Sequence, residues 1–368
     1  MERCGIRMDK LTEAREIIDE VDSRMAELFV RRMQAAELIA EHKLSHGLPV
    51  EDKVREDAMK VRLSARIPPV YRPYYEGFLT SLITESKKYQ TLLMQGMRTA
   101  FCGAAGAFAH IAAERIFPGC AAVPCPDFAS AYRAVETGDC AAAVLPIENS
   151  FVGDVGTVMD LMWRGPLSVS GIYDLPLDQS LLALPGVHLE DVREVRSHPQ
   201  ALAQCASFLA DKGWRVSEAA STASAARELA ASGRRDTAVI AARETAALYG
   251  LSVLADGIND SRTNTTRFAV FTAAAAVPRA GDGHFVLLFS TKNEPGALRD
   301  AISVIGGRHF NLKCLKSYPT GGQNWTYWFY TEGDGDLSTP AGQEMLSSLA
   351  GVCEKVRLLG SFGKETVL

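Results

Sequence analysis

An alternating spacing of three and four residues dominates the first part of the chain and constrains its fold more than any other feature. Apolar or small side chains occupy positions 11, 14, 18, 21, 25, 28, 35 and 39. A helix gathers such positions on one narrow stripe, so the spacing is typical of a coiled-coil seam about four heptads long. Two shorter helices cannot bury a stripe of this length, and we therefore expect a helical homodimer.

Three helices account for the N-terminal part of the sequence. Residues 9–96 are charged and periodic, with almost no glycine, and their prolines cluster at two places. This pattern predicts helices over 9–45, 50–64 and 71–96. We expect an all-helical domain over residues 1–96.

Two cations lie on the apolar side of the first predicted helix. Arg32 occupies a seam position, and Lys43 follows eleven residues later, which returns to within about 20° of Arg32 at about 100° per residue. Arg15 lies about 100° away around the helix, so it would reach the site of a partner chain. An unpaired buried charge is costly, and these cations therefore favour an anionic ligand.

Polar residues at helical spacing follow in the other two predicted helices. Asp52, Arg55 and Glu56 share one helix face, and Ser86 and Gln90 share another. A solvated face with ion pairs is the alternative interpretation of such a set. Taken in order, the eight positions resemble the all-helical class of chorismate mutase, whose motif reads Arg, Arg, Lys, Asp-x-x-Arg-Glu and Ser-x-x-x-Gln.

The resemblance implies that this domain converts chorismate to prephenate. The rearrangement is intramolecular, so the enzyme needs no nucleophile and no cofactor; it holds a dianion in a compact conformer and stabilises charge on the ether oxygen. The residues implied to act on the reacting molecule are Lys43 and Gln90, as donors to the ether oxygen, and Glu56, as acceptor from the ring hydroxyl. The residues implied to bind the substrate are Arg32, a partner's Arg15, Asp52, Arg55 and Ser86.

The composition of the sequence changes at Met97, after which alanine and glycine become frequent. Short runs of β type now alternate with helical stretches; the clearest are Thr99–Cys102, Ala141–Leu145, Ala238–Ala241 and Phe268–Thr272. This alternation predicts an α/β domain, which we place at residues 97–275.

Six short motifs in this region resemble, in their order and spacing, those of prephenate dehydratase. They are Phe101–His110, Pro146–Ser150, Ser197–Gln200 with Gln204, Ser221–Ala223, Tyr249–Leu251 and Asn264–Phe268. The resemblance implies two α/β lobes around a cleft, as in type II periplasmic binding proteins. It also implies the conversion of prephenate to phenylpyruvate with loss of water and carbon dioxide.

The same resemblance implies roles for individual residues. Thr266 is the acid that protonates the leaving hydroxyl, with Arg267 beside it as a substrate-binding residue. The residues implied to line the cleft are Asn149, Ser197, Gln204, Ser221 and Thr222. Three residues of these motifs have structural alternatives: Ser221 as a helix N-cap, Glu148 as a strand-end residue and His198 as a turn residue.

The first loop of this domain departs from the family pattern. Ala104 replaces a proline, and Ala107 and Ala109 replace residues with hydroxyl groups. Two hydrogen-bond donors are therefore missing at the edge of the predicted cleft, which makes a weak dehydratase an alternative.

The last part of the chain follows a linker of small residues and proline and covers residues 284–368. Strands are predicted at 285–291, 311–318, 325–332 and 355–362, with helices at 295–305 and 340–350. This βαββαβ order is that of the ferredoxin-like split motif, an α+β fold.

Two motifs of this last part resemble those of ACT regulatory domains. Asn293–Leu298 resembles the strand-to-helix loop, where a glycine lets an amino acid approach the backbone. The second motif, Glu-Ser-Arg-Pro, stands here as Lys316–Pro319. The resemblance implies L-phenylalanine as effector, with four regulatory residues: Gly296, Ala297, Leu298 and Ser317. A dimer-building domain without a ligand is the alternative.

Composition excludes several other classes of protein. The net charge of −5 argues against nucleic acid as a partner. No apolar run is long enough to cross a membrane, and the N-terminus lacks a signal core, so we expect a cytoplasmic protein. Neither a dinucleotide fingerprint, a P-loop nor zinc-type spacing of cysteine and histidine occurs, and we expect no metal and no cofactor.

Two further interpretations remain open at this point. In one, the mutase is active while the central domain is weak or directed to arogenate. In the other, the chain is a non-catalytic sensor of aromatic ligands, built from a binding-protein-like cleft and an ACT domain.

Overall fold

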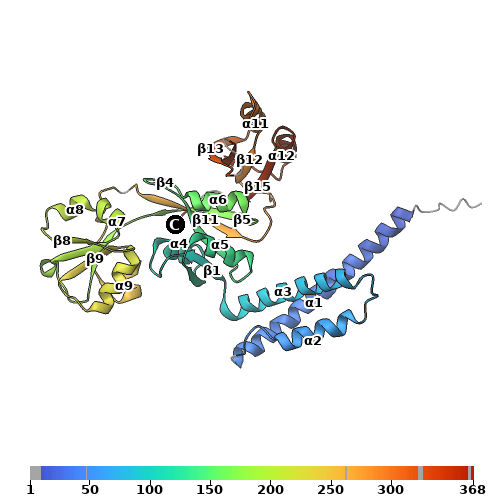
Figure 1. The fold of residues 1–368 in the computed structure, drawn as a ribbon, viewed down its shortest axis with the longest axis horizontal. Coiled ribbons are helices and arrows are strands. Elements are labelled where there is room, and N and C mark those ends of the chain that lie inside the picture. The colour runs from blue at the N-terminus through green and yellow to red at the C-terminus, as the bar shows by residue number, and fades with distance from the viewer. Residues whose placement is uncertain (1–9, 47, 262, 322–325, 364–365) are drawn as a thin grey trace, which may run out of the picture. The chain divides into compact units, whose positions relative to one another are not determined.

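The computed structural model describes residues 10–368 except 47, 262, 322–325 and 364–365. The chain separates into two compact units, Met1–Gly96 and Met97–Leu368. The first unit is helical, and the second contains three sheets with their covering helices (Figure 1). Within the described residues, no helix combines the length and the apolar character needed to cross a membrane.

The three predicted helices are confirmed as α1 (Lys10–Ser45), α2 (Lys53–Ser64) and α3 (Arg72–Gln95). Pro73 stands in the first turn of α3, where its missing N–H is tolerated. Both α1 and α2 pack against α3. These contacts bring the C-terminal half of α1 alongside the two polar positions of α3.

The N-terminal half of α1 has no cover within its own unit. Every residue from 10 to 31 is exposed, and these include five large side chains of the seam: Leu11, Ile18, Val21, Met25 and Leu28. Ala36 and Ala40, further along, are buried. Helices in proteins are stabilised mainly by packing of their apolar face, so this unit by itself buries only part of the seam.

The first lobe of the second unit is a sheet with the strand order β16-β5-β11-β3-β1-β2, to which β4 is added beside β3. Its strands are β1 (Arg98–Cys102), β2 (Ala121–Cys125), β3 (Ala142–Asn149), β4 (Gly153–Asp154), β5 (Ser168–Pro176), β11 (Thr265–Thr272) and β16 (Thr366–Val367). Its helices are α4 (Phe108–Ile116), α5 (Phe128–Glu136) and α6 (Gly156–Arg164). Strand β1 is parallel to β2 and β3, whereas β11 is antiparallel to β3 and β5.

The second lobe repeats this arrangement with the strand order β10-β6-β9-β7-β8. Its strands are β6 (Ser180–Ala183), β7 (Glu194–Ser197), β8 (Arg215–Glu218), β9 (Thr237–Ala241) and β10 (Ser252–Ala255). Its helices are α7 (Pro199–Gln204), α8 (Ala206–Ala210), α9 (Thr222–Ser232) and α10 (Glu244–Tyr249), with a short 3₁₀ helix at Leu189–Asp191. The predicted α/β region therefore has two lobes, each with its own buried cluster of apolar side chains.

The chain crosses twice between these lobes. It leaves the first lobe after β5 and returns from the second lobe between β10 and β11. The return crossing ends at Asn264, directly before β11, so the Asn264–Phe268 motif lies where the lobes join. All four runs of β type named from the sequence lie in strands, except that β3 begins one residue later than predicted, at Ala142.

The last sheet follows the predicted βαββαβ order. Its elements are β12 (His284–Ser290), α11 (Ala297–Gly306), β13 (Asn311–Pro319), β14 (Tyr327–Asp334), α12 (Pro340–Val352) and β15 (Lys355–Phe362). The sheet is antiparallel with the order β13-β14-β12-β15. We refer to it as the C-terminal sheet.

Both faces of the C-terminal sheet are covered. Phe285, Leu287 and Phe289 pack with α11 and α12 on one face, whereas Val286 and Leu288 join the apolar core of the first lobe on the other. Because alternate residues of a strand point to opposite faces, β12 is an uninterrupted buried run. The C-terminal sheet is thus packed directly on the lobe that contains β3 and β11.

Candidate active sites

The helical unit brings four of the predicted mutase residues together between α1 and α3. Arg32 donates from Nη1 to the carbonyl of Leu82 at 3.2 Å and to the hydroxyl of Ser86. Lys43 Nζ donates to Gln90 Oε1 at 3.4 Å. Ser86 and Gln90 are buried. The two cations predicted to share one side of α1 therefore both face the polar positions of α3.

No carboxylate of the described residues forms an ion pair with Arg32 or Lys43. Burial lowers the pKa of Arg32, but its guanidinium remains charged because an arginine pKa starts so high. The carbonyl and the hydroxyl that accept hydrogen bonds from Arg32 are uncharged, so they provide no counter-ion for its positive charge. The site therefore presents two cations to an anionic ligand.

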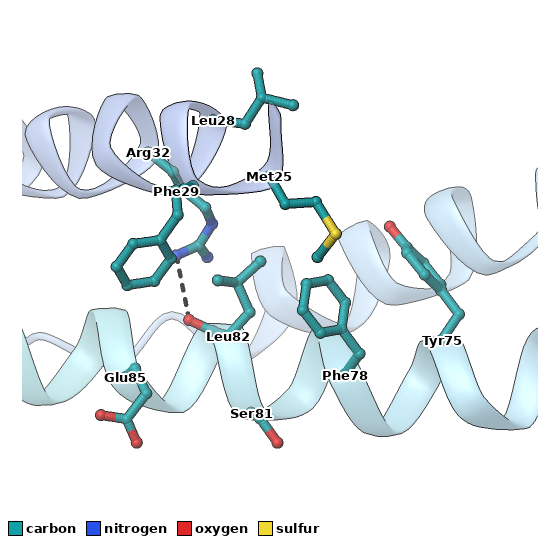
Figure 2. Close-up of a pocket in the computed structure, with 10 residues that line it drawn as sticks. Met25, Leu28, Phe29, Arg32, Tyr75, Phe78, Ser81, Leu82 and Glu85 are labelled. Carbon is teal, nitrogen blue, oxygen red and sulfur yellow. Dashed lines mark hydrogen bonds between the residues drawn. The ribbon is translucent and has the colours of Figure 1, made fainter. Parts of the chain in front are cut away.

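Arg32 also stands at one end of an apolar groove between α1 and α3, which is about 720 Å³ in volume. Figure 2 shows Met25 and Phe29 of α1 facing Phe78 and Leu82 of α3 across this groove. Arg15 is exposed on α1 and lies seventeen residues before Arg32, about 25 Å along the helix axis. It does not join the cluster of its own chain.

The residues predicted on α2 are placed differently from one another. Asp52 precedes the helix and caps it by accepting from the N–H of Arg55 at 3.1 Å, so its predicted place on a helix face is wrong. Arg55 is exposed. Glu56 Oε2 accepts from Lys87 Nζ at 3.1 Å. Sequence reasoning missed Lys87, because a single lysine on an amphipathic helix is indistinguishable from a solvated one.

In the first lobe, Thr266 and Asn149 are cross-strand neighbours on β11 and β3. Asn149 Nδ2 donates to Thr266 Oγ1 at 2.9 Å and to Asn264 Oδ1 at 2.9 Å. Asn149 Oδ1 accepts from the N–H groups of Phe151 and Val152 at 3.0 and 3.1 Å. These two backbone donors fix the orientation of the Asn149 amide, so its nitrogen must be the group that faces Thr266.

Two consequences follow for hydrogen-bond donors at this site. Thr266 Oγ1 accepts from Asn149, which leaves its own hydrogen available to donate. Asn264 presents its oxygen to Asn149, and its Nδ2 is buried with no hydrogen-bond partner among the described residues. Unpaired buried donors are rare in folded proteins, so this group is available to a water molecule or a ligand.

Asn264 lines a cavity of about 350 Å³ that also contains Gln204, Gln200 and Asn259. Gln204 was predicted as a cleft residue; its Oε1 accepts from Gln179 Nε2 at 3.4 Å. Asn264 was noted only as the start of a motif. Its place at the end of the crossing between the lobes, two residues before Thr266, is the signal that could have identified it.

Three other predicted cleft residues lie in places where they stabilise the fold. The Ser197 hydroxyl is fully buried and donates to the carbonyl of Ile240 at 2.6 Å, so its prediction as a cleft-lining residue is wrong. Ser221 is the N-cap of α9 and forms a capping box with Ser224, which confirms its structural alternative. Thr222 is the first residue of α9 and is half-buried.

Arg267 does not face the site, and its prediction as a substrate-binding residue is wrong. Successive residues of a strand point to opposite faces, so Arg267 points away from Thr266. Its guanidinium binds Glu332 of β14 in bidentate fashion at 2.9 and 2.7 Å. Asp174 and Glu148 lie 3.4 and 3.6 Å away. Hydrogen bonds from His284 and Arg267 hold the pKa of Glu332 well below its usual range, although burial opposes them.

The loop that departs from the family pattern is tied to the second lobe. Thr245 Oγ1 donates to the carbonyl of Gly106 at 3.0 Å, and the Tyr249 hydroxyl donates to the carbonyl of Ala105 at 2.8 Å. Ala107 is the N-cap of α4 and supplies no side-chain hydrogen bond. His198 was predicted to shape a turn; it is instead the N-cap of α7 and accepts from the N–H of Gln200.

The predicted regulatory residues lie on two neighbouring elements. Gly296 has φ +89° and precedes α11, which begins with Ala297 and Leu298. A Cβ added at Gly296 would meet the side chain of Arg299 at 3.1 Å. Ser317 is exposed on β13, and α11 packs beside β13.

Comparison with known proteins identifies both units. Residues 14–91 match the family chorismate mutase type II, and residues 99–276 match prephenate dehydratase. Arogenate dehydratase/prephenate dehydratase 2 of Arabidopsis thaliana is 35% identical over 284 residues, or 74% of this chain and 74% of that protein. A bifunctional chorismate mutase/prephenate dehydratase of Enterobacter agglomerans is 29% identical over 375 residues, or 97% of each.

One solved structure shares the fold of the second unit. It is a prephenate dehydratase from Arthrobacter aurescens in complex with L-Phe, 29% identical with a TM-score of 0.65, and the match covers 73% of this chain and 90% of that chain. Together with the two matched families, these similarities show that the chain belongs to the prephenate dehydratase family, in the bifunctional form that carries a chorismate mutase ahead of the dehydratase.

Proposed function

We propose that this chain makes phenylpyruvate from chorismate in two steps, with prephenate as the intermediate and L-phenylalanine as feedback effector. Residues 1–96 carry the mutase, residues 97–275 the dehydratase and residues 284–368 an ACT regulatory domain. The observation that carries the proposal is the hydrogen-bonded set of Asn149, Thr266 and Asn264, which presents two free donors at the junction of two lobes.

The mutase step needs positioned positive charge and hydrogen-bond donors. Arg32 binds a carboxylate of chorismate, and Lys43 and Gln90 donate to the ether oxygen as its bond to carbon breaks. The negative charge that develops on the ether oxygen lies in a partly buried site, where fixed hydrogen-bond donors stabilise a transition state more than water does. Ser86 orients Arg32 through the hydrogen bond that they share.

The mutase site is completed by a second copy of the chain. In this dimer, the N-terminal half of α1 from one protomer fills the apolar groove of its partner, and each protomer covers the exposed seam of the other. The groove (Figure 2) and the exposed seam side chains are the features of the single chain that such a partner would cover. This arrangement brings Arg15 of one chain to the Arg32 cluster of the other, where its guanidinium faces the second carboxylate of the substrate. The homodimer is supported by the groove and the exposed seam.

The dehydratase step removes the ring hydroxyl and the ring carboxylate together. Thr266 donates a hydrogen bond to the departing hydroxyl, which takes up a proton and leaves as water. The C–C bond between the ring and its carboxylate breaks at the same time, so that carbon dioxide is released and the electron pair of this bond enters the ring. The hydrogen bond that Thr266 accepts from Asn149 polarises its hydroxyl and strengthens it as a donor. A threonine hydroxyl is a weak acid, so its contribution is a directed hydrogen bond, with the proton supplied from solvent.

Arogenate is a second candidate substrate for the dehydratase. The Arabidopsis relative is named for both activities, and arogenate differs from prephenate only where an amino group replaces the keto oxygen of the side chain. The unpaired Asn264 Nδ2 favours prephenate if it faces that position, because an amide N–H donates to a keto oxygen and not to an ammonium group.

The ACT domain binds L-phenylalanine at the loop that ends in Gly296. Gly296, with its positive φ, directly precedes the first turn of α11, and a helix N-terminus favours a carboxylate; Ser317 lies on the neighbouring strand. The complex of the Arthrobacter aurescens relative with L-Phe supports an amino-acid effector. The cytoplasmic location stays a prediction from the sequence.

A coupled assay tests this function. Purified protein is supplied with chorismate, and both prephenate and phenylpyruvate are followed, with and without millimolar phenylalanine. We expect both products in sequence and inhibition of the second step by phenylalanine. Formation of neither product would support the non-catalytic sensor, and release of prephenate that is never consumed would support an arogenate-directed or weak dehydratase; arogenate supplied directly separates these two.

A further inference from the structure

The residues next to the catalytic pair contact the C-terminal sheet. Thr266 faces Asn149 across β11 and β3, and the next cross-strand pair along the ladder is Arg267 and Glu148. Because strand residues alternate between faces, this second pair lies behind the site. The backbone that holds the catalytic pair is therefore also the backbone that carries Arg267 and Glu148.

Four charges of alternating sign form a chain of contacts behind the site. Lys316 Nζ of β13 lies 2.7 Å from Glu148 Oε1, Glu148 lies 3.6 Å from Arg267, and Arg267 binds Glu332 of β14 at 2.7 Å. Strands β13 and β14 are hydrogen-bonded neighbours, so this chain of contacts begins and ends on the C-terminal sheet.

A second contact fixes the hairpin formed by β3 and β4. Lys316 Nζ also donates to Asp154 Oδ1 at 2.6 Å, and the Tyr318 hydroxyl donates to Asp154 Oδ2 at 2.7 Å. Asp154 pairs with Glu148 and Gly153 pairs with Asn149 across the hairpin. Lys316 thus contacts both strands of the hairpin one residue from Asn149.

These contacts are shielded from solvent. Only 2% of the Glu332 side chain, 19% of that of Arg267 and 26% of that of Lys316 are exposed. Charge pairs of this kind are strongly destabilised when one partner is removed, because the remaining charge stays buried. Burial lowers the pKa of Lys316, but hydrogen bonds to Asp154 and Glu148 outweigh it and raise the pKa above its ordinary value. The amine is therefore charged at neutral pH.

Given the dehydratase mechanism proposed above, on which this step rests, we propose that Lys316 is a positioning residue of the dehydratase reaction. Through Glu148 and Asp154 it fixes the β3–β4 hairpin and so holds the Asn149 amide against Thr266. The family pattern has glutamate at position 316 and arginine at 318. Glutamate at 316 would face two carboxylates here, so lysine and tyrosine suit the acidic hairpin of this particular chain.

The test compares Lys316→Met, Lys316→Arg and the control Lys313→Met, which removes an exposed lysine from the same strand. We expect Lys316→Met to lower dehydratase kcat about 10-fold or more, since small misplacements of catalytic groups have effects of this size. KM should change less than kcat, and Lys316→Arg should recover most of the rate. The mutase rate of the same preparation, from the other compact unit, should stay at the wild-type value in every variant.

Charge reversal tests the same idea without relying on one variant. Lys316→Glu and Asp154→Lys should each lower dehydratase kcat, and the double variant should regain several-fold over Lys316→Glu. A wild-type kcat in Lys316→Met, an equal loss in Lys313→Met, or no recovery in the double variant would overturn the proposal. Thr266→Ala in the same assay separates the two claims, because a fully active Thr266→Ala removes the proposed mechanism itself, whereas an inactive one beside a normal Lys316→Met removes only the role of Lys316.

Discussion

At the scale of single residues, the orientation of one amide decides what the dehydratase site offers to a substrate. Two backbone N–H groups hold Asn149 Oδ1, and its nitrogen is thereby directed at Thr266 and Asn264. The free hydrogen of Thr266 and the free Nδ2 of Asn264 both follow from this one constraint.

Asn264→Asp tests the free donor, because it keeps the shape of the side chain and removes the Nδ2 hydrogens. We expect dehydratase kcat/KM to fall by about 10-fold or more, since a lost hydrogen bond to a charged or reacting group is worth about 1.5–3 kcal/mol. The control is Gln200→Ala, an exposed residue of the same cavity, which should change kcat/KM less than threefold. Equal effects of both substitutions on steady-state kinetics would argue against a specific role of Asn264.

At the scale of secondary-structure elements, sequence periodicity predicted more than single motifs did. The three N-terminal helices, the alternation of strands and helices in the central domain and the βαββαβ order were all predicted from the spacing of apolar residues. A helix or strand that buries one face repeats its apolar residues every 3.6 or every 2 positions, and this repeat is visible in the sequence. The prediction placed Arg267 in the site because it follows Thr266 in the sequence, but neighbouring residues of a strand point to opposite faces of the sheet. Glu332, its partner, lies 65 residues further along the chain, and no local pattern connects the two.

Helix α4 allows a test of the loop that departs from the family pattern. Ala107 has the extended backbone of an N-cap, with φ −69° and ψ 156°, but no side chain to cap the helix. Ala107→Ser should stabilise the second unit by about 1 kcal/mol, seen as a higher midpoint of thermal unfolding by calorimetry. Ala109→Ser, which buries a hydroxyl within the helix, should give no gain. A gain from Ala109→Ser equal to that from Ala107→Ser would contradict the capping explanation.

Strand β7 allows a test of pH dependence. Hydrogen bonds from Ser217 and Arg215 lower the pKa of Glu194 to about 2, below the ordinary value of an unfolded chain. Its contribution to stability is therefore complete above about pH 4.5 and declines as the pH falls toward 2. Glu194→Gln should be less stable than wild type by about 1–3 kcal/mol at neutral pH.

The difference in the free energy of unfolding between wild type and Glu194→Gln should become smaller as the pH falls from 6 to 3.5. It is measured as the difference between their urea midpoints. Glu190→Gln, at an exposed site before the same strand, provides the matched control and should show a small gap that does not vary with pH. A gap for Glu194→Gln that stays constant over this range would contradict the assignment of the lowered pKa.

At the scale of the whole molecule, the two compact units are expected to act as separate catalysts joined by one chain. The candidate mutase residues all lie before Gly96 and the candidate dehydratase residues all lie after Met97. The packing of the C-terminal sheet on the first lobe could not be predicted from the sequence alone. This contact joins strands that are far apart in the chain, and the apolar residues that form it do not differ in sequence from those of any buried strand.

Mixed dimers test the completion of the mutase site by a second chain. Arg15→Ala and Arg32→Ala should each abolish mutase activity, because each removes a cation from every site of the homodimer. In a heterodimer of the two variants, one site loses both residues and the other keeps both, so mixing should restore about half of the wild-type rate per heterodimer. Heterodimers demonstrated by native mass spectrometry but without mutase activity would rule out a shared site.

The most direct measurement follows both products from chorismate in two single variants of the full chain. Thr266→Ala should accumulate prephenate at the wild-type rate and lose dehydratase activity by about 100-fold or more, the range expected for loss of one positioned hydrogen-bond donor in an active site. Arg32→Ala should make no prephenate from chorismate, yet convert added prephenate to phenylpyruvate at the wild-type rate. Loss of both reactions in either variant while the protein remains folded, or a full dehydratase rate in Thr266→Ala, would contradict two separate sites with these residues.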